Sequence, residues 1–75
     1  MNASLPVSPE IWMRQLFGAK AALDGGIVRR QVADVERIVG RLRFEAELRR
    51  RGYRAVENAG QLVIFCNRSP VRLLE

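Results

Sequence analysis

Histidine is absent from this chain of 75 residues, and cysteine and lysine each occur once, as Cys66 and Lys20. Without histidine the chain cannot form a Ser-His-Asp triad or a Cys-His catalytic pair, and it lacks the commonest metal ligand. A single cysteine excludes an internal disulfide and fits a reducing compartment. No apolar run approaches the roughly 18–20 residues that a membrane span requires. The sequence therefore predicts a cytoplasmic, non-enzymatic protein that uses no metal or cofactor and no membrane.

The remaining reactive side chains fit structural roles better than catalytic ones. Cys66 ends the apolar run of residues 62–66 and has no histidine to act as its base, so we expect a small buried hydrophobe. Glu45 and Glu47 would point about 200° apart on a helix, which excludes an acid–base pair and favours ion pairs with arginines three or four residues away. Gly25 and Gly26 lack the lysine of a phosphate-binding loop, so they are interpreted as a helix stop.

Composition and length predict one small folded unit. Hydrophobic residues make up 48% of the chain and charged residues 28%, a composition too apolar for a disordered chain. A chain of 75 residues is also too short for two domains. Residues 1–7 show no periodicity and are expected to form a flexible arm. Residues 8–75 are expected to form a single α+β domain.

The first predicted element is a long amphipathic helix. Ser8, Pro9 and Glu10 are a favourable helix start, with a serine cap, proline at the first position and an acid facing the helix dipole. Apolar residues then recur at helical spacing, at Trp12, Leu16, Ala19 and Leu23. We expect one helix over this stretch, ended by residues 24–26, and a short strand over residues 27–29.

Gly40 decides how the next stretch folds. Residues 32–39 carry apolar residues on one helical face. If a single helix continued to Arg51, Phe44 and Leu48 would fall on the opposite face, and a small domain seldom buries both sides of a helix. A break near Gly40 lets a third helix, over residues 42–51, turn Phe44 and Leu48 inward. We favour the break, and the unbroken helix is the alternative.

A β-hairpin is expected after the third helix. Residues 53–57 and 61–66 are strand-like, and Asn58, Ala59 and Gly60 form a short turn between them. The nearly continuous apolar run of the second strand is typical of a central strand. Residues 71–74 either add an edge strand or pack across the core. The predicted core consists of Trp12, Leu16, Ile38, Phe44, Leu48, Val63 and Phe65.

Positive charge is concentrated in one third of the sequence. Thirteen basic residues against eight acidic ones give a net charge of +5, and all the basic residues except Lys20 are arginine. Residues 29–54 hold nine arginines and four acids and therefore carry the whole excess. Guanidinium groups bind phosphate and carboxylate through paired hydrogen bonds, so these arginines are the candidate binding residues. They are Arg29, Arg30, Arg37, Arg41, Arg43, Arg49, Arg50, Arg51 and Arg54.

The order helix, short strand, helix, helix, hairpin resembles the winged helix-turn-helix. The resemblance is carried by the strand at residues 27–29, the Gly40 turn, the basic helix at residues 41–51 and the hairpin at residues 53–66. It implies a third helix that enters the DNA major groove and a hairpin that forms the wing. Residues 25–30 and 52–67 also resemble a group of short uncharacterised bacterial proteins, which implies no function.

Two main functions follow as hypotheses. The first is a small basic module that contacts nucleic acid or a nucleoprotein complex through the nine arginines. The second is an inhibitor or adaptor from a phage or mobile element, similar to anti-CRISPR proteins, that binds an acidic surface of a host protein complex. A structural subunit that assembles through the hairpin edge is a third alternative. The choice among DNA, RNA and protein targets, and the oligomeric state, stay open at this point.

Overall fold

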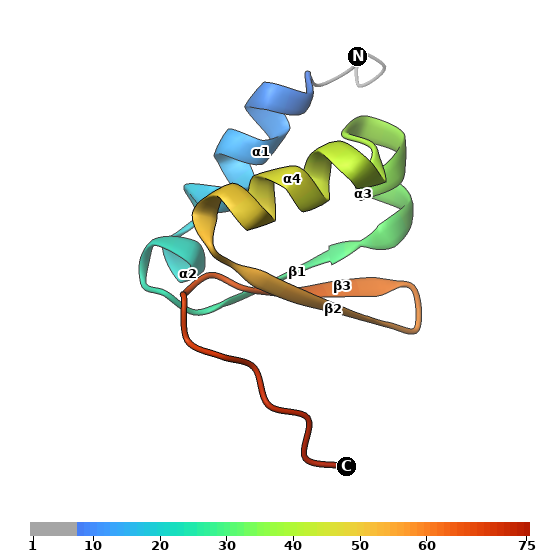
Figure 1. Cartoon of the computed structure of the whole chain (residues 1–75). Coiled ribbons are helices and arrows are strands. Elements are labelled where there is room, and N and C mark those ends of the chain that lie inside the picture. The colour runs from blue at the N-terminus through green and yellow to red at the C-terminus, as the bar shows by residue number, and fades with distance from the viewer. Residues whose placement is uncertain (1–7) are drawn as a thin grey trace.

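The protein is a small α+β domain in which helices cover one side of a three-stranded antiparallel sheet (Figure 1). The computed structural model describes residues 8–75, so the predicted arm at residues 1–7 lies outside the described residues. The elements are α1 (Pro9–Phe17), α2 (Lys20–Leu23), β1 (Ile27–Gln31), α3 (Val32–Ile38), α4 (Arg41–Arg51), β2 (Arg54–Asn58) and β3 (Gln61–Phe65). The predicted fold class and the hairpin that follows the helices are confirmed. Within the described residues no helix has the length and apolar character needed to cross a membrane.

The sheet has the strand order β1-β3-β2. In its middle row Arg29 pairs with Val63, which pairs on its other side with Val56. The prediction of a central strand at residues 61–66 is confirmed, because β3 has a neighbour on both edges. β1 is longer than the three residues expected.

The predicted single helix over residues 9–23 is wrong, because the chain breaks at Gly18 into α1 and α2. The N–H of Gly18 donates to the carbonyl of Arg14 at 2.8 Å, and Ala19 then adopts an extended conformation with ψ 151°. A Cβ at Gly18 would lie only 2.8 Å from the Arg14 carbonyl oxygen, so glycine is needed there. The break buries Ala22 and leaves Leu23 exposed, which a regular helical stripe does not predict.

The predicted break near Gly40 is confirmed. Gly40 has φ 93°, a conformation that favours glycine, and α4 begins at the next residue. The turn buries Phe44 and Leu48, as expected, while Leu42 stays 82% exposed on the outer side of α4. Gly52, with φ 76°, ends α4 in a left-handed cap, a conformation that favours glycine.

The core lies between the helices and one face of the sheet. Its buried residues are Leu16, Phe17, Ala22, Val28, Val35, Phe44, Leu48, Leu62, Ile64 and Cys66. Leu16, Phe44 and Leu48 are therefore correctly predicted core residues, and Trp12 packs against the core from a half-buried position. Val63 and Phe65 are corrections, together with Ile38, which is also only half-buried. Because side chains alternate along a strand, Leu62 and Ile64 take the core face of β3, and Val63 and Phe65 take the other.

The hairpin turn and the end of the chain complete the fold. Ala59 and Gly60 have φ 52° and 77° and form the hairpin turn, which confirms two residues of the turn predicted at 58–60, while Asn58 belongs to β2. The expected C-terminal edge strand is not formed, and the alternative of packing across the core is wrong as well. Residues 66–75 contain no strand, and Leu73 and Leu74 are more than nine-tenths exposed.

Candidate functional site

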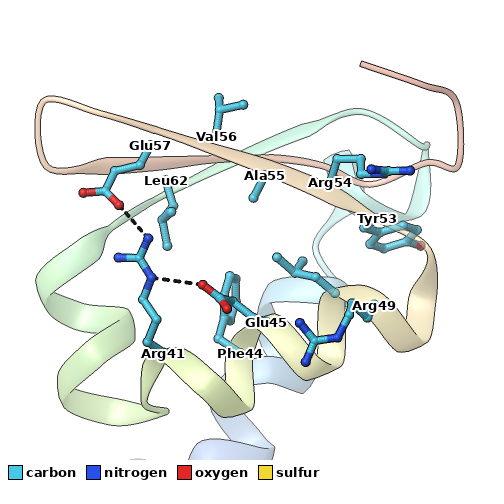
Figure 2. A pocket seen from close by; sticks show the side chains of 11 residues that line it. Arg41, Phe44, Glu45, Arg49, Tyr53, Arg54, Ala55, Val56, Glu57 and Leu62 are labelled. Carbon is cyan, nitrogen blue, oxygen red and sulfur yellow. Dashed lines mark hydrogen bonds and ion pairs between the residues drawn. The ribbon is translucent and has the colours of Figure 1, made fainter. Parts of the chain in front are cut away.

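A groove runs between α4 and the edge strand β2 (Figure 2). Its volume is about 260 Å³. Apolar side chains of Phe44, Leu48, Ala55 and Leu62 line it. In Figure 2, Ala55 and Leu62 point from the sheet toward α4, and charged side chains lie at the two ends of the groove. The two ends differ in how their charges are balanced.

Arg41 closes one end of the groove. Its guanidinium contacts three carboxylates, those of Glu57 at 2.8 Å, Glu45 at 3.2 Å and Glu36 at 3.4 Å. The hydrogen bond to Glu57, followed by the one to Glu45, raises the pKa of Arg41 above its usual value. This end therefore has no free positive charge, and a second anion would meet three carboxylates.

Four more of the predicted binding arginines also contact acids. They are Arg37 with Asp34, Arg43 with Glu10, and Arg50 and Arg51 with Glu47. The hydrogen bond from Arg50 lowers the pKa of Glu47, so this carboxylate is charged at neutral pH. Arg51 also lies over the Phe17 ring, 4.2 Å from its centroid, where it acts as part of the core rather than as a free cation.

The ion pairs leave the excess charge on a defined set of side chains. Among residues 8–75, seven of the eight acids pair with six of the thirteen basic residues. The acid that remains is Glu75. The arginines that remain are Arg14, Arg29, Arg30, Arg49, Arg54, Arg68 and Arg72. The seven unpaired arginines and Glu75 sum to a charge of +6, and the paired side chains sum to −1. The excess positive charge therefore lies on the unpaired arginines, and on α4 only Arg49 belongs to them.

Three of the unpaired arginines gather where α4 passes into β2. Arg49 and Arg54 line one hollow together with Gly52 and Tyr53, at the end of the groove away from Arg41 (Figure 2). Arg68 comes from the segment after β3, packs against Gly52 and donates its Nε–H to the carbonyl of Arg51 at 3.3 Å. We call this set, Arg49, Arg54 and Arg68 around Gly52, the Gly52 corner. All three arginines are exposed.

The other predicted binding residues lie elsewhere. Arg29 and Arg30 are on β1, at the opposite edge of the sheet from β2, and Arg30 donates to the carbonyl of Arg29 at 2.6 Å. The structure thus distributes the nine predicted arginines over α3, α4 and both edge strands, and only Arg49 and Arg54 of that set belong to the Gly52 corner. Sequence reasoning missed Arg68. The available signal was that Arg68 lies three residues after the central strand, whose last residue, Phe65, pairs with Arg54.

Cys66 is buried, in agreement with the sequence interpretation. Burial raises the pKa of its thiol, and the more distant charges of Arg51 and Arg30 only partly oppose this. Since the thiolate is the nucleophilic form, Cys66 is unsuited to nucleophilic chemistry near neutral pH.

We predict that Cys66 reacts slowly with a thiol reagent in the native protein and rapidly in denaturant. Replacement with serine should lower the free energy of unfolding by about 1–3 kcal/mol, because a hydroxyl would enter an apolar site. Replacement with alanine should leave ligand binding unchanged. Chromogenic thiol titration and denaturant unfolding measure these effects. Loss of binding in a folded alanine variant would contradict a structural role.

Within residues 8–75 no group of three or more acidic or cysteine side chains is placed to hold a metal ion. Comparison with protein-family models, curated proteins and solved structures finds no match. What the chain does must therefore be argued from its own residues, and the Gly52 corner is the strongest cluster they offer.

Proposed function

We propose that the chain is a small non-enzymatic module that binds nucleic acid by contacting backbone phosphates through the Gly52 corner. The observation that carries the proposal is that Arg49, Arg54 and Arg68 come from segments that meet at Gly52, are exposed, and have no acidic partner among residues 8–75. Guanidinium groups match phosphate oxygens in geometry and charge. Arginines already bound to carboxylates must first give up those contacts, so they contribute less.

The winged-helix resemblance enters this proposal in a restricted form. It implies α4 as the helix that meets DNA, and α4 supplies Arg49 to the Gly52 corner. All four of the other α4 arginines form ion pairs, with Glu10, Glu45 or Glu47. We therefore propose that binding is weakly dependent on base sequence, since phosphate contacts fix position without reading bases.

The groove favours a second candidate function. Its apolar lining ends at the Gly52 corner, so it could receive a protein segment that carries an apolar side chain followed by a carboxylate. This arrangement would serve the inhibitor or adaptor function. In that case the same arginines would bind aspartate or glutamate, and nucleic acid would not be required.

We expect the protein to bind a fluorescently labelled duplex of random sequence with a marked dependence on salt. Each phosphate neutralised contributes about −0.9 to the slope of log affinity against log salt concentration, so three engaged arginines predict a slope of about −2.7. Fluorescence anisotropy at several salt concentrations measures this slope. Absence of binding at low salt would reject the nucleic-acid proposal and leave the protein partner.

A further inference from the structure

The sheet has a second face that no helix covers. By alternation from the paired strands, the residues on this open sheet face are Ile27, Arg29, Gln31, Arg54, Val56, Asn58, Gln61, Val63 and Phe65. In Figure 2, Val56 points away from α4, whereas Ala55 points toward it. Ile27 and Val56 are 46% and 43% exposed, and Val63 and Phe65 between them are half-buried. The four apolar side chains are cross-strand neighbours and form one continuous patch.

The end of the chain carries apolar side chains that also lack cover. Leu73 and Leu74 are 91% and 92% exposed, and Val71 is 43% exposed. Helices α1, α3 and α4 lie on one side of the sheet, and the C-terminal segment leaves on the other, the side of the open sheet face (Figure 1). The molecule thus presents an apolar patch and an apolar segment on the same side of the sheet.

The segment is directed away from its own sheet by specific contacts. The amide of Asn67 donates to the carbonyl of Gly25 at 3.0 Å, and its side-chain oxygen accepts from the N–H of Ser69 at 2.9 Å. Pro70 follows, and its ring restricts Ser69 to extended conformations. These constraints oppose an immediate return of the segment onto its own sheet, while they leave it free to reach another molecule.

We infer that two copies of the chain associate by exchange of residues 70–75, with the segment of each copy packed across the open sheet face of the other. Val71, Leu73 and Leu74 would cover the apolar patch, because burial of exposed apolar area is favourable. Reciprocal exchange closes the assembly as a two-fold pair.

The charges on the open sheet face favour binding of the exchanged segment over direct stacking of the open faces of two copies. Among residues 8–75 the open sheet face contains Arg29 and Arg54 and no acid, so two stacked faces would bring four arginines together. The exchanged segment is neutral instead, because it carries one cation, Arg72, and one acid, Glu75. It therefore brings no net positive charge to the open sheet face. Apart from Arg54, the open sheet face shares no residue with the Gly52 corner, so the two chains can pair whether or not nucleic acid binds.

Size-exclusion chromatography with light scattering tests the association. The full chain should have the mass of two chains at high concentration, and the double variant Leu73→Asp, Leu74→Asp should have the mass of one. The matched control is Leu23→Asp with Leu42→Asp, two leucines that are 74% and 82% exposed outside the contact and should leave the pair intact. A single-chain mass for the full chain at every soluble concentration would overturn the inference, as would a paired Leu73→Asp, Leu74→Asp variant.

A peptide titration tests where the segment binds. A synthetic peptide of residues 69–75, added to the full-length Leu73→Asp, Leu74→Asp variant, should shift the NMR signals of Ile27, Val56 and Val63 and leave those of Leu42 in place. Shifts confined to the groove residues Leu48 and Ala55, or no shifts, would reject the open sheet face as the binding surface. Duplex DNA is added to the same variant in a parallel titration. If DNA shifts the signals of Ile27 and Val56 and the peptide does not, this face binds nucleic acid and the inference is overturned.

Discussion

The variant Phe44→Ala is expected to be mostly unfolded at physiological temperature. Phe44 is 2% exposed and stacks on Phe17, with ring centroids 6.4 Å apart. It also lines the groove beside α4. Truncation of a buried phenylalanine costs about 3–5 kcal/mol, and a domain of this size has a total stability near the lower end of about 5–15 kcal/mol. One such substitution therefore removes most of the free energy of unfolding.

Thermal unfolding followed by circular dichroism measures this loss. Leu42→Ala is the control, since Leu42 lies on the same helix but is 82% exposed, and its melting temperature should stay close to that of the parent. A melting temperature for Phe44→Ala within a few degrees of the parent would mean that Phe44 is not in the core. In that case α4 could not be oriented as the Gly40 turn places it.

Reversal of the charge of the three arginines in the Gly52 corner should abolish nucleic-acid binding without unfolding the protein. The triple variant Arg49→Glu, Arg54→Glu, Arg68→Glu replaces three phosphate-binding groups with groups that repel phosphate. Loss of three charge-assisted contacts, at about 1.5 kcal/mol each, predicts an affinity about 1000-fold weaker. The melting temperature should change little, because these side chains are exposed and make no ion pair within residues 8–75.

A second triple variant separates the effect of where the arginines lie from the effect of the total charge of the protein. Arg14→Glu, Lys20→Glu, Arg37→Glu changes the net charge by the same amount at exposed sites that are not part of the Gly52 corner. It should weaken binding by roughly tenfold or less, since exposed charges that make no direct contact with phosphate act only at long range and are screened by salt. Equal losses in the two variants would mean that only the overall charge attracts nucleic acid. Unchanged binding in the first variant would remove the Gly52 corner from the interface.

Local signals were sufficient for much of the fold. The Gly40 break follows from the conflict between two helical faces, and the hairpin follows from a turn of residues that tolerate positive φ. The split at Gly18 could not be predicted, because the helical periodicity continues through it and the break depends on where Ala22 packs. Phe65 was misplaced because an apolar run does not indicate which of its residues face the helices.

Sequence reasoning predicted arginines as the candidate binding groups, but it did not indicate which of them are unpaired or where they lie. Counting charges within residues 29–54 treats every arginine as equivalent. Whether an arginine is free depends on acids that are distant in the chain, such as Glu10 beside Arg43 and Glu57 beside Arg41. These pairs are 33 and 16 residues apart, so only the tertiary structure separates neutralised arginines from unpaired ones.

The most direct measurement is an NMR titration of the arginine Nε–Hε signals with a short duplex of random sequence. The proposal predicts that the signals of Arg49, Arg54 and Arg68 shift on binding, because their guanidinium groups contact phosphates. The signals of Arg37 and Arg41 should stay in place, because their carboxylate partners hold them. Shifts that spread equally over paired and unpaired arginines, or that are absent from the Gly52 corner, would contradict the proposal.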